Sequence, residues 1–296
     1  MNQHIRNWSV ASVLFLGLGA TALLWHSRAP RQPLSAAPRA AEQPASSATT
    51  VPPAAARENP PAGARPEKEK PEPVREGVAA LPASESLEYT AHVAKVNNVA
   101  TLRFVTGEHR TFLGRAAWHL QAFAHTQNPL RIIFVLDDQF DSYSDAVTLA
   151  SLQYELHLNE RGQKVEAVLR MSSGNETAPA DATAARVLPG TRDPLGMLQY
   201  LRAVNWTNTA EVRSPVYDGH KLYEVRARLA GSSEKVAVPA GEFAASRIEL
   251  RVFENGTEAK DIHFAVYLAN TAARTPVLLE AVIPIGTARV ELLRVQ

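Results

Sequence analysis

The chain has 296 residues, of which 45% are hydrophobic and 21% are charged, and this composition suits one or two folded units. The 31 basic and 30 acidic side chains give a net charge of +1, so no strong field of either sign favours nucleic acid or a cationic partner. The absence of cysteine excludes disulfides, thiolate metal sites and cysteine nucleophiles.

The first predicted element is a membrane-spanning helix. An uncharged apolar run extends from Trp8 to Trp25, and at about 1.5 Å per residue a helix of this length nearly crosses the hydrocarbon core of a bilayer. The two tryptophans bracket the run at depths where indole rings favour the membrane interface. The run is longer than the apolar core of most secretory signals, and no suitable cleavage site follows it closely. We expect residues 1–26 to form an uncleaved signal anchor; the alternative is a signal that is removed after export.

The orientation of this anchor follows from its position more than from its charge. Arg6 on one side and Arg28 and Arg31 on the other nearly balance the positive charges that flank the run. A very short N-terminal tail usually stays in the cytoplasm. We therefore expect a single-pass inner-membrane protein with its C-terminal domain in the periplasm, or, if the signal is cleaved, a secreted periplasmic protein.

Residues 27–83 are predicted to be a disordered linker. This stretch is rich in proline and alanine, holds more than half of the chain's 20 prolines, and has almost no large apolar residues. Such a composition forms no core and favours extended polyproline II segments. The linker is therefore expected to act as a stiff tether that holds a folded domain away from the membrane.

Residues 84–296 are predicted to form one mostly antiparallel β domain. Apolar residues recur at every second position in several short segments, which is the period of a half-buried strand. These segments are LEYTAHV, LQYELHL, KVEAVLRM, RIELRVF, DIHFAVYL and VLLEAVIP.

Turn residues separate these predicted strands. Asp218-Gly219 and Asn255-Gly256 tolerate positive φ and predict hairpins, Asn97-Asn98 is a weaker hairpin candidate, and Gly162 is expected to turn LQYELHL back into KVEAVLRM. The segment FLGRAAWHLQAFAH fits either a helix or a strand, and its flanking strands favour the strand.

One segment predicts a short helix. In DPLGMLQYLRAV, Asp193 is a suitable N-cap and Pro194 suits the first helical position. The apolar face of this helix is expected to consist of Leu195, Leu198, Tyr200 and Leu201.

Signals for catalysis and metal binding are scarce. The sequence lacks HExxH, G-x-S-x-G, Walker A and G-x-G-x-x-G motifs, so no enzyme activity, catalytic residue or cofactor is predicted. The segment DDQFDSYSD offers carboxylates but lacks the glycine and glutamate of a calcium loop, so an exposed polar loop is favoured. His119 and His125 would share one strand face, but three or four convergent ligands are needed for zinc, and no metal site is predicted.

The C-terminal half resembles a known family. RDPLGMLQYLRAV, VYDGHKLYEVRA, VPAGEFAASRIELRVFENG, FAVYLANTAARTPVLLEA and IGTARVELL together are similar to the family called domain of unknown function 3108, with SLEYTAHV and DDQFDSYSDAVTL as weaker matches. The resemblance implies a bacterial envelope protein with an open, LolA-like antiparallel β structure, a twisted sheet or open barrel with one or two short helices. Where that family tends to have a tryptophan and an acidic pair, this chain has Tyr267 and Asn270, ahead of Arg274 and Pro276.

Three functions are compatible with a tethered β domain of this kind. The first is a non-catalytic binding module that holds a lipid-like apolar ligand or engages an envelope partner, with Phe112, Trp118, Tyr200 and Trp206 as candidate pocket-wall residues. The alternatives are a structural or assembly scaffold of the envelope and an unrecognised enzyme. The expected partners are the inner membrane through residues 8–25 and a ligand or protein of the envelope, with no nucleic acid.

Overall fold

The structure is a computed structural model that describes residues 81–160, 162–172, 182–260, 263–283 and 286–296. The predicted anchor with Trp8 and Trp25, and nearly all of the predicted linker, lie outside these residues. Within the described part of the chain, no helix is both long enough and apolar enough to cross a bilayer.

The described residues form a single large sheet, as the alternating pattern predicts. Its strands are β1 (Glu85–Val93), β2 (Val96–Phe112), β3 (Arg115–Thr126), β4 (Asp137–Asp145), β5 (Ser151–Glu160), β6 (Gln163–Ser172), β7 (Thr183–Arg186), β8 (Glu211–Tyr217), β9 (Leu222–Val238), β10 (Gly241–Glu254), β11 (Thr257–Glu258), β12 (His263–Ala269), β13 (Pro276–Ile283) and β14 (Gly286–Val295). Two helices accompany them, α3 (Leu130–Ile133) and α4 (Pro194–Ala203).

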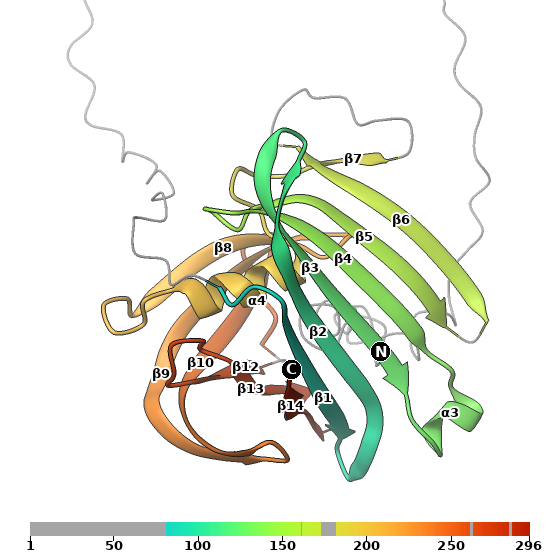
Figure 1. The fold of residues 1–296 in the computed structure, drawn as a ribbon, viewed down its shortest axis with the longest axis vertical. Coiled ribbons are helices and arrows are strands. Elements are labelled where there is room, and N and C mark those ends of the chain that lie inside the picture. The colour runs from blue at the N-terminus through green and yellow to red at the C-terminus, as the bar shows by residue number, and fades with distance from the viewer. Residues whose placement is uncertain (1–80, 161, 173–181, 261–262, 284–285) are drawn as a thin grey trace, which may run out of the picture. The chain divides into compact units, whose positions relative to one another are not determined.

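The strand order is β7-β6-β5-β4-β3-β2-β1-β14-β13-β12-β10-β9-β8, with β11 paired to β10. All these pairs are antiparallel except β6 with β7. The first and last strands therefore lie side by side in the middle of the sheet, where β1 pairs with β14 (Figure 1). The prediction of an all-β domain with an open, antiparallel sheet and one or two short helices is confirmed.

The second half of the sheet curls back on itself. The β9–β10 hairpin is long, and the backbone N–H of Ala240 at its turn donates to the carbonyl of Leu292 on β14 at 3.0 Å. Figure 1 shows β9 and β10 bending around the ends of β12, β13 and β14. This contact closes the hairpin over the inner face, where the buried side chains of the two halves meet in one main core cluster.

Most predicted turns are confirmed. Gly162 and Gly219 have positive φ (79° and 97°), as do Asn255 (50°) and Gly256 (79°), and all lie between consecutive strands. The prediction of a hairpin turn at Asn97-Asn98 is wrong, because both residues lie inside β2. The chain reverses a few residues earlier, at Ala94, which takes a φ of 54°. The backbone N–H of Ala94 donates to Thr287 of the neighbouring β13–β14 hairpin, so tertiary contact fixes the turn there.

The segment DDQFDSYSD was expected to be an exposed loop and is instead strand β4. Its alternation is hidden because both faces carry polar residues. Asp138, Ser142 and Ser144 are buried on the face that meets α4, while Asp141 and Tyr143 point to the other face. The ambiguous segment FLGRAAWHLQAFAH is extended, as its flanking strands predict, and contributes most of β3.

Helix α4 confirms the predicted N-terminal signals and lies on the inner face of the sheet. The Asp193 carboxylate accepts the backbone N–H of Gly196 at 2.8 Å, and Pro194 begins the first turn. The same carboxylate accepts the hydroxyls of Ser142 on β4 and Ser151 on β5, each at 2.5 Å. The helix cap therefore also attaches α4 to the first half of the sheet.

Arg192, one residue earlier, attaches the helix to the second half. Its backbone N–H donates to the Pro215 carbonyl on β8, and its guanidinium donates to the Ser214 hydroxyl at 2.9 Å and to the Thr148 carbonyl at 2.7 Å. The guanidinium also lies 3.7 Å from the ring centroid of Tyr200. Arg192 and Asp193 thus join the neighbouring strands β4 and β5 to β8, which lies at the other end of the sheet.

The C-terminal end of α4 is held by two further arginines. Arg202 forms a buried bidentate ion pair with Glu85 of β1, at 2.7 and 3.0 Å. Arg274, in the loop between β12 and β13, donates to the carbonyls of Arg202 and Val204, at 3.1 and 2.5 Å. These carbonyls have no partner inside the helix, so Arg274 caps it. The arginine of the Arg-x-Pro motif therefore has a structural role.

Gly196 gives a first testable prediction, because α4 approaches β4 closely at this residue. A Cβ atom there would lie 3.0 Å from the Ser144 hydroxyl and 3.2 Å from the Leu149 carbonyl. Alanine normally stabilises a helix relative to glycine, but overpacking here is expected to lower the free energy of unfolding by about 1–3 kcal/mol in Gly196→Ala. Urea unfolding measures this loss. Adding Ser144→Ala should restore part of it, and an unchanged or higher midpoint in Gly196→Ala would contradict the close approach.

Candidate partner-binding site on the outer face

The face of β3 to β6 that points away from α4, the outer face, carries polar and aromatic side chains in register. One row across β3, β4, β5 and β6 consists of His119, Tyr143, Gln153 and Arg170. The next row consists of Gln121, Asp141, Glu155 and Val168. Residues distant in sequence are therefore neighbours on this face.

Three rings are stacked at one end of the outer face. The ring of Phe112 lies parallel to that of Tyr143, with centroids 4.0 Å apart and planes 9° apart. The imidazole of His119 stacks on Tyr143 at 4.7 Å and 7°. Phe112 reaches this position from the end of β2, after a register shift between Thr106 and His109. Figure 1 shows the β2–β3 hairpin projecting beyond its neighbours.

Two arginines flank the stacked rings. The guanidinium carbon of Arg170 lies 5.3 Å from the Phe112 centroid, and that of Arg110 lies 5.9 Å from the Tyr143 centroid. These distances allow cation–π attraction. Within the residues that the structure describes, neither guanidinium forms an ion pair with a carboxylate. We call Arg110, Phe112, Tyr143 and Arg170 the arginine–aromatic patch.

A buried carboxylate supports the patch from the next row. Asp141 accepts hydrogen bonds from His119 at 2.7 Å, Gln121 at 2.8 Å and Gln139 at 2.7 Å. Burial alone would raise the pKa of Asp141, but these hydrogen bonds outweigh burial and keep the pKa below its usual value. The ionised carboxylate fixes the imidazole against Tyr143, so the stacked rings are held in place.

Tyr143 keeps its proton at physiological pH. Burial, and then the negative charge of Glu155, raise the pKa of its phenol, while Arg110 acts in the opposite direction. The patch therefore combines two cations, two aromatic faces and a neutral hydroxyl. Its chemistry suits contact with carboxylates and apolar groups, and it places no activated nucleophile among its own residues.

The four predicted pocket-wall residues are not gathered in one wall. Trp118 and Tyr200 pack in a small cluster beside α4 with Leu120 and Leu149, on the inner face. Trp206 is buried in the main core, where its indole N–H donates to the Leu201 carbonyl at 2.8 Å. Phe112 belongs to the patch on the outer face. Tyr200 also packs against the main core, so Trp118, Tyr200 and Trp206 lie in the packed interior and only Phe112 lies on the outer face.

The aspartates and histidines that the sequence offered as metal ligands form ion pairs or hydrogen bonds with neighbouring side chains. Asp145 accepts from Arg115 at 2.6 Å, and His125 contacts Asp137 at 2.9 Å. Among the described residues, no three His, Asp or Glu side chains lie close enough to hold a metal ion. Sequence reasoning did not find Arg110, Tyr143 or Arg170, whose only signal is their alternate position on strands that later prove to be neighbours.

The fold defines the protein as an open antiparallel β domain with a helix fixed across its inner face and the arginine–aromatic patch on the outer one. The chain belongs to the family described as protein of unknown function (DUF3108), which matches residues 88–293. The resemblance of the C-terminal half to this family is confirmed. No curated protein matches the chain.

Two solved structures have a similar course of the chain. A beta-barrel-like protein of domain of unknown function DUF1849 from Brucella abortus is 12% identical, with a TM-score of 0.48 over 74% of this chain and 98% of that one. A hypothetical protein from Chlamydia trachomatis is 8% identical, with a TM-score of 0.35 over 74% of this chain and 89% of that one. Both similarities are too distant to transfer a function.

Proposed function

We propose that the chain is a non-catalytic cell-envelope protein, tethered at the inner membrane, whose β domain binds an envelope protein through the arginine–aromatic patch. The observation that carries this proposal is the pair of arginines, Arg110 and Arg170, that flank stacked rings without a carboxylate partner of their own in the described residues. Tyrosine and arginine are the side chains that most often dominate the energy of protein interfaces.

Preorganisation supports the same function. Binding usually costs side-chain entropy, but His119 and Asp141 already hold Tyr143, and Phe112 is already stacked on it. A partner carboxylate that meets Arg110 or Arg170 would satisfy guanidinium donors that cation–π contact leaves free. The patch is thus suited to an acidic or aromatic segment of a partner.

The inner face of the sheet is covered by a fixed helix, which favours a protein partner on the outer face over a lipid-like ligand on the inner face. Helix α4 lies there, and hydrogen-bonded side chains fix both of its ends to the sheet, through Asp193 and Arg192 at one end and Arg202 at the other. A lipid-like ligand is the second candidate, favoured by Leu158 and Val165, which are register partners on the inner face near the β5–β6 turn, with Val165 exposed.

Site-specific photocrosslinking tests the proposal in the full chain and in its own envelope. A photoreactive residue in place of Arg110 is expected to give a discrete protein adduct, and adding Arg170→Ala should weaken capture by about 30-fold, the effect of losing a hot-spot side chain of about 2 kcal/mol. Capture is measured as adduct yield against expression level.

Arg226 provides a matched control. It also stacks on an aromatic ring, with 4.0 Å to the Phe253 centroid, but it is ion-paired with Glu224 at 2.5 Å. A photoreactive residue at position 226 should not give the adduct. Equal adducts from both positions, or none from position 110, would rule out the patch as the binding surface.

A further inference from the structure

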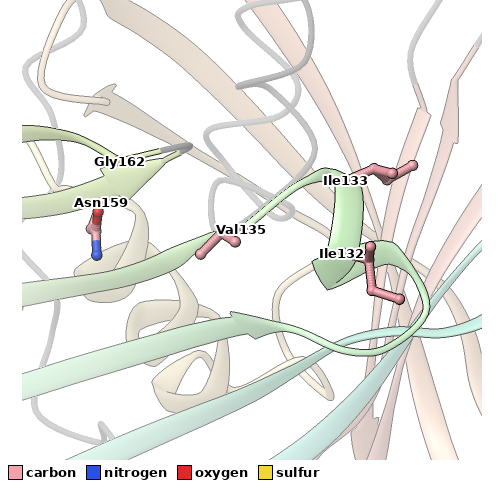
Figure 2. A pocket seen from close by; sticks show the side chains of 5 residues that line it. All are labelled: Ile132, Ile133, Val135, Asn159 and Gly162. Carbon is pink, nitrogen blue, oxygen red and sulfur yellow. The ribbon is translucent and has the colours of Figure 1, made fainter.

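The end of the sheet that carries α3 exposes apolar side chains. Ile132 and Ile133 are 79% and 78% exposed, the largest fractions among the exposed large hydrophobic residues of the described chain. Figure 2 shows both on the turn of α3, beside an open depression of about 620 Å³ that Val135, Asn159 and Gly162 also line. Adjacent isoleucines this exposed are unfavourable in water unless something covers them.

Two hairpins lie at the same end of the sheet. The β1–β2 turn is there because β2 starts opposite the end of β3, where Ala100 pairs with Thr126 just before α3. The β5–β6 turn is there because Gln139, near the start of β4, pairs with His157 near the end of β5. Figure 1 shows α3 and both turns at the lower end of the sheet. We call α3 with these two hairpins the α3 rim.

The two hairpins add lysines to the apolar tip. Lys95 and Val96 are exposed at the β1–β2 turn, and Lys164 is exposed on β6 as the register partner of Asn159. Within the described residues, neither lysine forms an ion pair with a carboxylate. Asp137, which follows α3 in the chain and lies on the outer face, is paired with the Arg131 guanidinium through bonds of 2.7 and 2.8 Å.

We propose that the α3 rim docks on the surface of an anionic lipid bilayer, with Ile132 and Ile133 inserted at the headgroup level and Lys95 and Lys164 against the lipid phosphates. The pattern of a protruding apolar tip with flanking lysines matches interfacial insertion, because lysine stems extend along apolar surface while their ammonium groups reach phosphate. Protein interfaces, by contrast, are depleted in lysine.

The α3 rim and the arginine–aromatic patch are separate surfaces, so this inference goes beyond partner binding and does not depend on it. The β2–β3 hairpin, which carries Phe112 of the patch, projects at the opposite end of the sheet from α3 (Figure 1), and Leu113 belongs to its turn. With the α3 rim on the membrane, the patch would face away from the bilayer, where a partner can reach it.

The absence of cysteine makes a direct test simple. Full-length Ile133→Cys is labelled with an environment-sensitive fluorophore and reconstituted in vesicles of equal parts phosphatidylglycerol and phosphatidylcholine, with brominated lipids as quenchers. The expected result is a blue shift and quenching of the label at position 133. Leu113→Cys, an exposed apolar position at the other end of the sheet, is the matched control and should show neither effect.

Charge is tested in the same system. Lys95→Gln with Lys164→Gln should lower the ratio of docked to undocked domain by about 25-fold, since each lysine near an anionic surface contributes about five-fold. Vesicles of phosphatidylcholine alone should give a similar loss. No quenching at position 133, or equal quenching at positions 133 and 113, would overturn the proposal. Crosslinking from position 110 would be unaffected by that outcome, so the two proposals fail separately.

Discussion

Replacing Arg202 with methionine is expected to lower the free energy of unfolding by about 3–5 kcal/mol, the largest single effect predicted for this domain. Arg202 and Glu85 have exposed fractions of only 1% and 6%, and their bidentate contact lies between α4 and β1. The guanidinium also donates to the Gln199 side chain and to the Ala273 carbonyl. Methionine fills a similar volume but leaves the Glu85 carboxylate buried without its cation.

Chemical denaturation of single and double variants separates the pair from the packing. Glu85→Gln with Arg202→Met removes both charges, and it should be more stable than Arg202→Met alone, because no unpaired buried charge is left. Arg294→Met is the control, since Arg294 makes a similar bidentate contact with Glu88 but is exposed, and its loss should cost at most about 1 kcal/mol. Equal losses for Arg202→Met and Arg294→Met would show that burial of the pair is unimportant.

The strands whose one face is apolar were predictable from the sequence, and those with two polar faces were not. In β12, Phe264, Val266 and Leu268 alternate with residues of intermediate or high exposure, so period two is visible in the letters alone. In β4, Ser142 and Ser144 replace apolar residues because the inner face there meets the cap of α4. Asp138, at the other end of the strand, accepts the backbone N–H of Asn159, and only Phe140 between them packs in the main core. The alternation of apolar residues that marks a half-buried strand is therefore missing from the sequence of β4.

The ends of α4 show how far local signals reach. Asp193 and Pro194 specify where the helix begins, and both act within one turn of it. Arg274 acts on the other end from 70 residues away, through a loop whose course depends on the pairing of β12 with β13. A cap supplied from such a distance has no local pattern, so the role of the Arg-x-Pro motif emerged only from the three-dimensional structure.

The candidate site was beyond prediction for the same reason. Phe112 was expected in a pocket wall because it is aromatic, yet the register shift in β2 and the bend of the hairpin carry it to the outer face. Arg170 joins it from β6, which pairs with β5 and not with β2. Composition identified residues able to bind, but only the strand order decides which of them are neighbours.

Asp137 and Asp138 give the second large prediction, because they are adjacent in sequence and face opposite sides of β4. Asp138 has an exposed fraction of 2%, and its carboxylate accepts the backbone N–H of Asn159 at 2.8 Å. Burial, and to a smaller extent the neighbouring Glu160 and Asp137, raise the pKa of Asp138 to about 7. For Asp137, the hydrogen bond from Arg131 lowers the pKa to about 2.

These opposite shifts give opposite pH dependences. A carboxyl with a raised pKa binds its proton more tightly in the folded state, so the stability it contributes is complete below the unfolded pKa of about 4 and is lost as pH rises to about 7. The upper bound of that loss is about 4 kcal/mol. Asp137 stabilises above pH 4, and its contribution is lost as pH falls toward 2.

Asp138→Asn is therefore expected to raise the free energy of unfolding at pH 8 by about 1–3 kcal/mol and to flatten its decline between pH 4 and pH 7. The amide keeps an oxygen for the Asn159 N–H and places an N–H₂ donor toward Glu160 in place of the second carboxyl oxygen. Urea unfolding at several pH values, read as the difference between wild type and variant, cancels the other groups that titrate in this range.

Asp137→Asn is the matched control, with the opposite sign. It removes a partly exposed ion pair, so it should cost about 1 kcal/mol near neutral pH, and that cost should vanish below pH 4. If both variants shift stability in the same direction at pH 8, or if the slope between pH 4 and pH 7 is unchanged in Asp138→Asn, Asp138 is not the buried acid that the strand register implies. Opposite changes in the free energy of unfolding would show that the side of β4 on which a carboxylate lies determines whether it stabilises or destabilises the fold.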